Sequence, residues 1–148
     1  MYSRSEKYLL TQEFWTTFGK WSTTKRKRLG LREKWLLNKT GVRGIRFRFS
    51  VERKQPGVHM DITEKFNDNR TALLEKIVAL KSVFVEAVAA EIIWDLENPL
   101  QDSPLLTIQT NGLTPMNKEN WPAIFKFFYT NMLALEMVFE EYKDYLEG

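Results

Sequence analysis

The sequence predicts a single α+β domain over residues 1–148, in which helices cover a four-stranded antiparallel sheet mainly on one face. Apolar and polar residues alternate over 42–53 and again over 58–63, as in half-buried strands. Apolar residues recur with helical spacing over 4–22, over 70–92 and from Asn120 onward. Two shorter apolar runs separate the last two helices. The order is therefore α-ββ-α-ββ-α, which is typical of an antiparallel α+β layer fold.

The first helix is predicted over residues 4–22, and a basic connection follows it. An apolar stripe with steps of four, four and three defines the helix: Leu10, Phe14, Phe18 and Trp21. Residues 23–41 are polar and rich in Lys and Arg. We expect this connection to contain at most a short helix, at LREKWLLNK (31–39).

A β-hairpin with one solvent-facing side is predicted for residues 42–63. On its first strand one face is apolar and the other polar: Ile45, Phe47, Phe49 and Val51 against Arg46, Arg48, Ser50 and Glu52. Pro56 and Gly57 suit the centre of a type II turn. The second strand, VHMDIT (58–63), continues the alternation and places His59 and Asp61 on the polar side.

The second half of the chain is predicted to contain two helices and two short strands. The first of these helices spans 70–92, with Asp68 or Asn69 as its N-cap. The strands lie at IIWDLE (92–97) and LLTIQT (105–110). The last helix begins near Asn120, and Pro122 is tolerated in its first turn. Its apolar positions alternate steps of four and three from Trp121 to Leu146.

Composition excludes several classes of protein. Hydrophobic residues make up 43% of the chain, enough for a packed core without a disulfide or a metal. The absence of cysteine excludes disulfides, thiolate zinc sites and a cysteine nucleophile. The N-terminal MYSRSEKYLL lacks the apolar core of a signal peptide, and no apolar run reaches the roughly 20 residues of a membrane span. We therefore expect a cytoplasmic protein without membrane contact.

Positive charge is concentrated in one part of the chain. The net charge is +3, but residues 20–54 hold thirteen Lys or Arg and two acids, a net of +11. Residues 55–148 carry a net charge of −8. Such an imbalance bears on partners rather than on fold. The basic part suits a polyanion, or the acidic part of a second copy of the chain.

Four segments follow one another in an order that resembles a known family: EFWTTFGKW, GIRFRFSVERKQPGVHMDI, NRTALLEKIVALKSVFVEAVAAEIIW and NWPAIFKFFYTNMLALEMVFEEY. The chain is similar to an uncharacterised bacterial domain of unknown function that is common in Bacteroidetes. Some members form the C-terminal part of proteins whose N-terminal part is a predicted restriction-endonuclease-like nuclease. The resemblance covers most of the chain and implies an association with DNA defence by analogy, but it brings no catalytic residues.

The sequence offers little support for catalysis. A restriction-type nuclease needs an acid on one strand and Glu/Asp-x-Lys on the next strand to hold Mg²⁺. Glu52 and Lys54 match the second half, but no Asp precedes Asp61. The only histidine, His59, is expected near Glu52, where a polar cross-strand pair is commoner than a general base. We predict no catalytic residue, metal ligand, cofactor or small-molecule site, and a nuclease using Glu52 and Lys54 is the weakest alternative.

The favoured function is an accessory domain of a DNA-defence system that holds the backbone of DNA or RNA. Nine cations form the predicted surface: Lys25, Arg26, Lys27, Arg28, Arg32, Lys34, Arg43, Arg46 and Arg48. Arginine suits bidentate phosphate contacts, and affinity that depends on phosphates falls with salt. Base readout is not expected, because Phe47 and Phe49 belong to the buried face of their strand.

The alternative is a protein-interaction or homo-oligomerisation module without nucleic-acid contact. The last helix carries more apolar area than one sheet face needs, and its spacing over about 26 residues would also allow a homodimer through this helix. The effect of salt concentration on binding and on dimer formation distinguishes the two functions. Nucleic-acid binding should disappear at high salt and in Arg46→Glu/Arg48→Glu, whereas an apolar dimer should persist.

Overall fold

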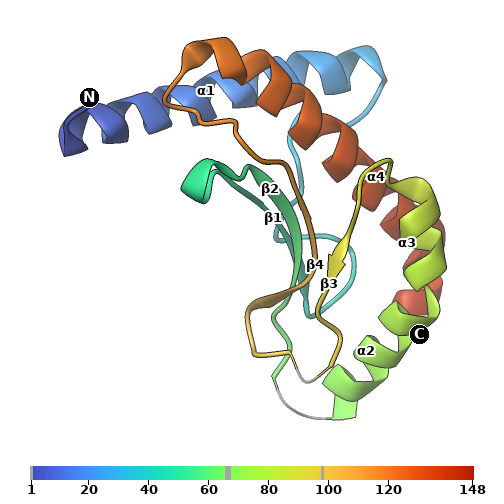
Figure 1. The fold of residues 1–148 in the computed structure, drawn as a ribbon. Coiled ribbons are helices and arrows are strands. Elements are labelled where there is room, and N and C mark those ends of the chain that lie inside the picture. Colours follow the sequence, from blue (N-terminus) through green and yellow to red (C-terminus); the bar gives the residue numbers. More distant parts are fainter. Residues whose placement is uncertain (1, 66–67, 98) are drawn as a thin grey trace.

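The computed structural model describes residues 2–65, 68–97 and 99–148 and has the predicted α+β architecture (Figure 1). In chain order its elements are α1 (Arg4–Arg28), β1 (Ile45–Ser50), the 3-10 turn η1 (Glu52–Lys54), β2 (Gly57–Ile62), α2 (Asp68–Ala79), α3 (Lys81–Ala87), β3 (Ile93–Trp94), β4 (Ser103–Gln109), the 3-10 turn η2 (Lys118–Asn120) and α4 (Trp121–Glu147). The strands form one antiparallel sheet in the order β1-β2-β4-β3. Helices α2, α3 and α4 follow one face of this sheet.

The predicted hairpin alternation is confirmed. In the β1–β2 register Phe47 lies opposite Met60, and both side chains are buried. The neighbouring pair, Arg46 opposite Asp61, lies on the other face. Strand β2 pairs on its second side with β4, and the register shifts between Met60 and Asp61. The helix-free face of the sheet therefore presents the polar residues of the hairpin.

Helix α4 contributes most of the helical part of the core. Its predicted stripe is buried at seven positions: Trp121, Phe125, Phe128, Met132, Leu135, Phe139 and Leu146. Helix α1 packs against it through rings, because Phe14 and Phe18 each lie about 5 Å from Phe125, with centroid distances of 5.3 and 5.4 Å. The apolar area of α4 is thus largely used inside the domain.

Several predictions of local structure differ from the structure. The predicted turn centred on Pro56 and Gly57 is wrong, because Gly57 begins β2 opposite Ser50 and lacks the positive φ of a type II turn. The connection between β1 and β2 instead contains η1.

Three predicted helix boundaries also differ. Helix α1 continues to Arg28, six residues further than expected, because basic residues are good helix formers and favour the negative end of the helix dipole. Gly30 follows with a φ of 71°, a left-handed conformation suited to the end of a helix. The segment 31–39 is not helical, since the Phe47 N–H donates to the Leu37 carbonyl and holds it along β1. The helix predicted over 70–92 is divided at Leu80 and ends at Ala87.

Candidate nucleic-acid interface

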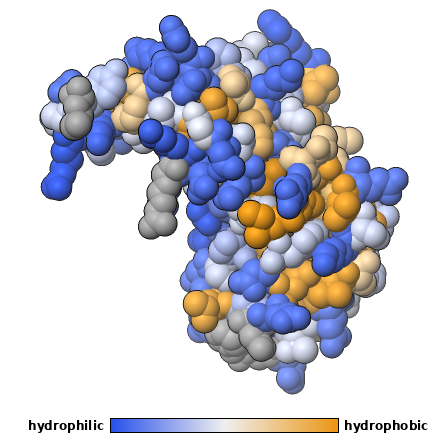
Figure 2. Space-filling model, in the orientation of Figure 1, coloured by the Kyte–Doolittle hydropathy of each residue, from blue (hydrophilic) through white to orange (hydrophobic). Residues whose placement is uncertain are grey.

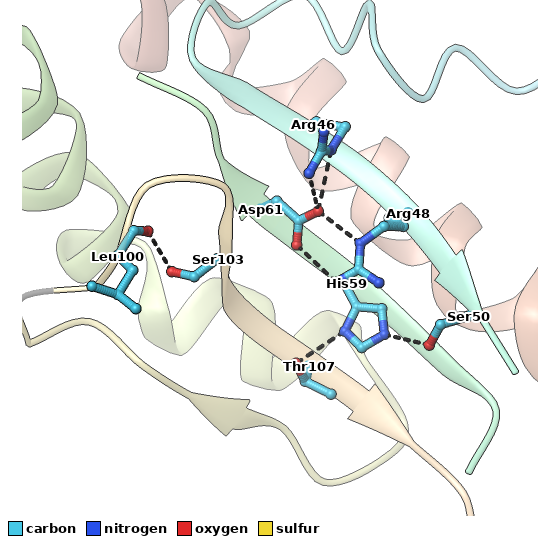
Figure 3. A network of polar contacts seen from close by, with 8 residues as sticks. All are labelled: Arg46, Arg48, Ser50, His59, Asp61, Leu100, Ser103 and Thr107. Carbon is cyan, nitrogen blue, oxygen red and sulfur yellow. Dashed lines mark hydrogen bonds and ion pairs between the residues drawn. The ribbon is translucent and has the colours of Figure 1, made fainter. Parts of the chain in front are cut away.

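Two arginines of β1 share one carboxylate of β2 (Figure 3). The Nε and Nη2 atoms of Arg46 lie 3.2 and 2.9 Å from Oδ2 of Asp61. The Nε atom of Arg48 lies 2.8 Å from the same oxygen, and its Nη2 lies 3.3 Å from Oδ1. Asp61 is completely buried beneath the arginines, whose side chains are 33% and 40% exposed. The cluster therefore carries a net charge of one rather than two.

His59 joins three strands beside this cluster (Figure 3). Its Nε2 lies 2.7 Å from the Ser50 hydroxyl on β1, and its Nδ1 lies 3.1 Å from the Thr107 hydroxyl on β4. Burial lowers the pKa of His59 to about 4, and the positive charge of Arg48 adds to this effect while Asp61 opposes it. The imidazole is thus neutral at pH 7 and too weak a base to activate Ser50 effectively. The expected pair with Glu52 does not form, since Ser50 and Thr107 are the side chains that bond to the ring.

Five predicted cations follow one another around the end of α1, and all are exposed: Lys25, Lys27, Arg28, Arg32 and Lys34. Within the described part of the chain, none of the five has a carboxylate oxygen within 4 Å. Lys25 does contact a ring, with its Nζ 5.1 Å from the centroid of Trp21. Arg43 is also highly exposed, and its Nε lies 3.8 Å from a carboxylate oxygen of Glu64.

Arg26 is placed differently from its neighbours. Its side chain is 2% exposed, and its Nη1 lies 3.0 Å from Oε1 of Glu136 on α4. Its Nε donates to the Arg32 carbonyl at 2.6 Å, and the guanidinium lies 4.1 Å from the ring centroid of Trp35. Arg26 thus joins α1, the connection and α4, and it does not reach the surface predicted for phosphates.

A groove lies between α1, the segment 33–38 and β1, and we call it the α1–β1 groove. It consists of two adjoining hollows of about 680 and 430 Å³, which share Trp15, Leu37 and Phe49. Lys34 lines the larger hollow, and Arg46 and Arg48 line the smaller one. The structure thus brings a cation of the connection and two of the strand to the walls of one groove. Lys25, Lys27, Arg28, Arg32 and Arg43 do not line either hollow.

Among the groove residues that the sequence did not assign to a site, Trp15, Trp35 and Lys20 bear most directly on binding. Trp15 flanks the α1 stripe rather than belonging to it, Trp35 lies in the connection, and Lys20 lies on α1 just before the basic run. A tryptophan in a polar, basic connection was the one available signal, because such a residue needs a partner surface.

The nuclease alternative gains no geometric support. Glu52 and Lys54 lie in the 3-10 turn η1 rather than on a strand. Across residues 2–65, 68–97 and 99–148, no three potential His, Asp or Glu ligands come together as a metal site. None of the helices in the described ranges has the length and apolar character needed to cross a membrane.

Comparisons with known proteins give one match. The model of a family described as a domain of unknown function (DUF4268) matches residues 10–143. Comparisons with curated proteins and with solved structures find no match.

Proposed function

The chain belongs to the DUF4268 family of domains of unknown function, and on this premise we propose that it is an accessory domain that binds the backbone of a nucleic acid. The contact surface, here called the basic surface, comprises eight of the predicted cations: Lys25, Lys27, Arg28, Arg32, Lys34, Arg43, Arg46 and Arg48. Arg26 is left out because it is buried against Glu136.

One observation carries this proposal: the exposed cations at the end of α1 have no carboxylate partner within the described residues. Lysine and arginine on a protein surface are commonly neutralised by nearby acids or by mobile ions. Here the segment 20–54 has a net charge of +11 and contains only Glu33 and Glu52 as acids. Phosphates at regular spacing supply the missing countercharge, and binding releases counterions from the nucleic acid.

The proposed setting is a DNA-defence system in the bacterial cytoplasm. Its support is the resemblance of this chain to domains that follow restriction-endonuclease-like nucleases in longer proteins. In that arrangement a non-catalytic domain that holds nucleic-acid backbone would keep the nuclease near its substrate.

The test is fluorescence anisotropy of labelled single- and double-stranded DNA and RNA at about 50 and 200 mM salt. With five phosphate contacts, affinity for the duplex should fall roughly a hundredfold or more over this range. Lys27→Glu/Arg28→Glu should abolish binding, because both exposed side chains lie in the last turn of α1. The matched control is Lys81→Glu/Lys126→Glu, which makes the same charge change at exposed positions of α3 and α4. No binding at low salt, or equal losses in the two double variants, would refute the proposal.

A second candidate, a homodimer through the C-terminal helix, has its own observation. Although the main stripe of α4 is buried, Met137 on α4 and Val85 on α3 remain 63% and 54% exposed. A hollow of about 510 Å³ lies between the two helices, lined in part by Val83, Leu133 and Met137. Figure 2 shows hydrophobic residues in patches on the half of the molecule that contains α3 and the sheet. Sedimentation at low and high salt tests this candidate, since an apolar dimer survives high salt and dissociates in Met137→Lys.

A further inference from the structure

We propose that the α1–β1 groove accepts unpaired bases, so that the preferred ligand is a single-stranded nucleic acid. This inference rests on the proposed function, because it names the kind of strand that the basic surface holds. The alternation along β1 argued against base contacts, since Phe47 and Phe49 face inward. The rings of the groove, however, come mostly from α1 and from the segment 33–38, and Phe49 reaches the groove from the edge strand β1.

The rings that line the groove are held in place by rings behind them. Trp15 is half-buried and stacks on Phe128, with an interplanar angle of 1° and centroids 5.8 Å apart. Phe49 contacts Phe128 at 4.8 Å and Trp35 at 5.9 Å. Trp35 in turn packs edge-on against Tyr129, at 5.7 Å. A platform with fixed rings loses little conformational freedom when a base stacks on it.

The groove is lined by cations as well as by these aromatic rings. Lys20 and Lys34 line the larger hollow, together with one acid, Glu33. Arg46 and Arg48 line the smaller hollow. Arg46 and Arg48 already share Asp61, but Lys20 and Lys34 have no carboxylate partner within the described residues. An apolar peptide would leave these two lysines without a countercharge, whereas a nucleic acid offers a flat apolar base and a phosphate within one nucleotide. A duplex keeps its bases stacked inside, so only a single strand satisfies both parts of the groove.

The two arginines retain donors for a phosphate. Asp61 accepts hydrogen bonds from the Nε and Nη2 atoms of both guanidiniums. In the described part of the chain the Nη1 atom of each arginine has no acceptor, and the side chains are about one-third or more exposed. The size of the larger hollow, about 680 Å³, lies within the roughly 300–1,000 Å³ typical of small-molecule sites.

Gly19 provides a way to fill the groove without disturbing the core. It lies on α1, lines the larger hollow, and a Cβ atom added there meets nothing within 4 Å. Gly19→Leu therefore places a side chain in open space while replacing a poor helix former with a good one. The matched control is Ala79→Leu, which enlarges an exposed side chain at the end of α2, outside both hollows.

The test compares three labelled probes, each about 16 units long: single-stranded DNA, an abasic deoxyribose-phosphate strand, and duplex DNA. The wild-type protein should bind the single strand about tenfold more tightly than the abasic strand, which has the same charge without bases. Gly19→Leu should remove that tenfold difference and leave the affinities for the duplex and the abasic strand unchanged. Ala79→Leu should bind all three probes as the wild-type protein does.

Other outcomes separate the failure of this inference from the failure of the proposed function. Equal affinities for the single and abasic strands, with no effect of Gly19→Leu, would overturn the base-binding role while backbone binding stands. A groove that serves an apolar peptide of another protein would give this same result. No binding of any probe at about 50 mM salt would overturn both proposals.

Discussion

Arg48 on β1 binds Asp61 of β2 diagonally across the hairpin. The residue directly opposite Arg48 in the strand register is His59. Arg46, which does lie opposite Asp61, binds the same carboxylate oxygen. Diagonal contacts of this kind are within reach of long side chains on one face of an antiparallel pair. The consequence is that one buried acid sets both the position and the net charge of the two arginines that line the α1–β1 groove.

Asp61→Asn should therefore tighten nucleic-acid binding while it destabilises the fold. The substitution raises the net charge of the cluster by one, so the slope of log affinity against log salt should become steeper by about 0.7–0.9. Removing one partner of a buried ion pair costs up to about 3–5 kcal/mol, and the partial exposure of both arginines should reduce this cost to about 1–3 kcal/mol. Anisotropy and urea denaturation measure the two effects.

The control for this variant is Asp95→Asn, which removes the same charge from an exposed side chain after β3. It should leave stability unchanged within about 0.5 kcal/mol. If Asp61→Asn binds no more tightly than Asp95→Asn, the arginines do not contact the ligand.

The free energy of unfolding should decrease as the pH is lowered, because His59 is held neutral in the folded protein. Its pKa is lowered to about 4 in the folded protein, whereas an unfolded histidine titrates near 6.5. The unfolded chain therefore binds a proton first, so the contribution of the neutral ring is complete above pH 6.5 and is lost as the pH falls to about 4. The ring remains partly exposed, and the loss should be about 1–3 kcal/mol.

Nuclear magnetic resonance measures this pKa directly, because His59 is the only histidine in the chain. Denaturation of the wild-type protein and of His59→Gln at pH 7 and pH 5 gives the stability difference. A folded-state titration near 6.5 would show that burial and Arg48 do not act on the ring as described.

Arg26 and Lys27 are neighbours in the sequence, but their substitutions should have different effects. Replacing Arg26 should lower stability, whereas replacing Lys27 should weaken nucleic-acid binding. Arg26→Ala removes the ion pair to Glu136 and the hydrogen bond to the Arg32 carbonyl, at a cost of about 3 kcal/mol. The folded fraction of that variant should bind nucleic acid with nearly unchanged affinity. Lys27→Ala should leave stability unchanged and weaken binding, since its exposed side chain has no carboxylate partner in the described residues.

Urea denaturation measures the stability of both variants, and fluorescence anisotropy measures their affinity for nucleic acid. Arg26→Lys provides a further comparison, because it retains the charge but loses the fork that reaches two acceptors. A stable Arg26→Ala variant with weakened binding would mean that Arg26 belongs to the contact surface after all.

The contrast between these two residues marks the limit of what the sequence predicts. The strands and the stripe of α4 depend on local periodicity, so the alternation at Ile45 and Phe47 and the spacing from Trp121 were sufficient to predict them. The burial of Arg26 depends on Glu136, which lies 110 residues away. The composition of the run KRKR does not distinguish that arginine from Lys27. Arg26 continues the buried face of α1 at steps of four from Phe14 and Phe18, but this spacing applies only because the helix extends past the predicted end at residue 22.

The α1–β1 groove could not be predicted from the sequence for the same reason, because it also depends on contacts between distant segments. Trp15, Trp35 and Phe49 belong to three segments that meet only after the connection is held along the edge of β1. The expected short helix at 31–39 would have placed Trp35 differently. Tertiary contacts override weak local propensity in such a segment, and these contacts are set by residues outside it.

Substitution of alanine for glycine should raise the stability of the protein at Gly19 and lower it at Gly44. Gly19→Ala should stabilise the protein by about 0.5–1 kcal/mol, because the residue lies within α1 and its new methyl group meets nothing within 4 Å. Gly44 has a φ of 89°, and a Cβ atom there would lie 2.9 Å from Cβ of Glu64. Gly44→Ala should therefore destabilise the protein by about 1–3 kcal/mol, since both the backbone and the contact resist the change. Urea denaturation of the two variants provides the measurement, and equal midpoints would contradict the conformation of the turn that leads into β1.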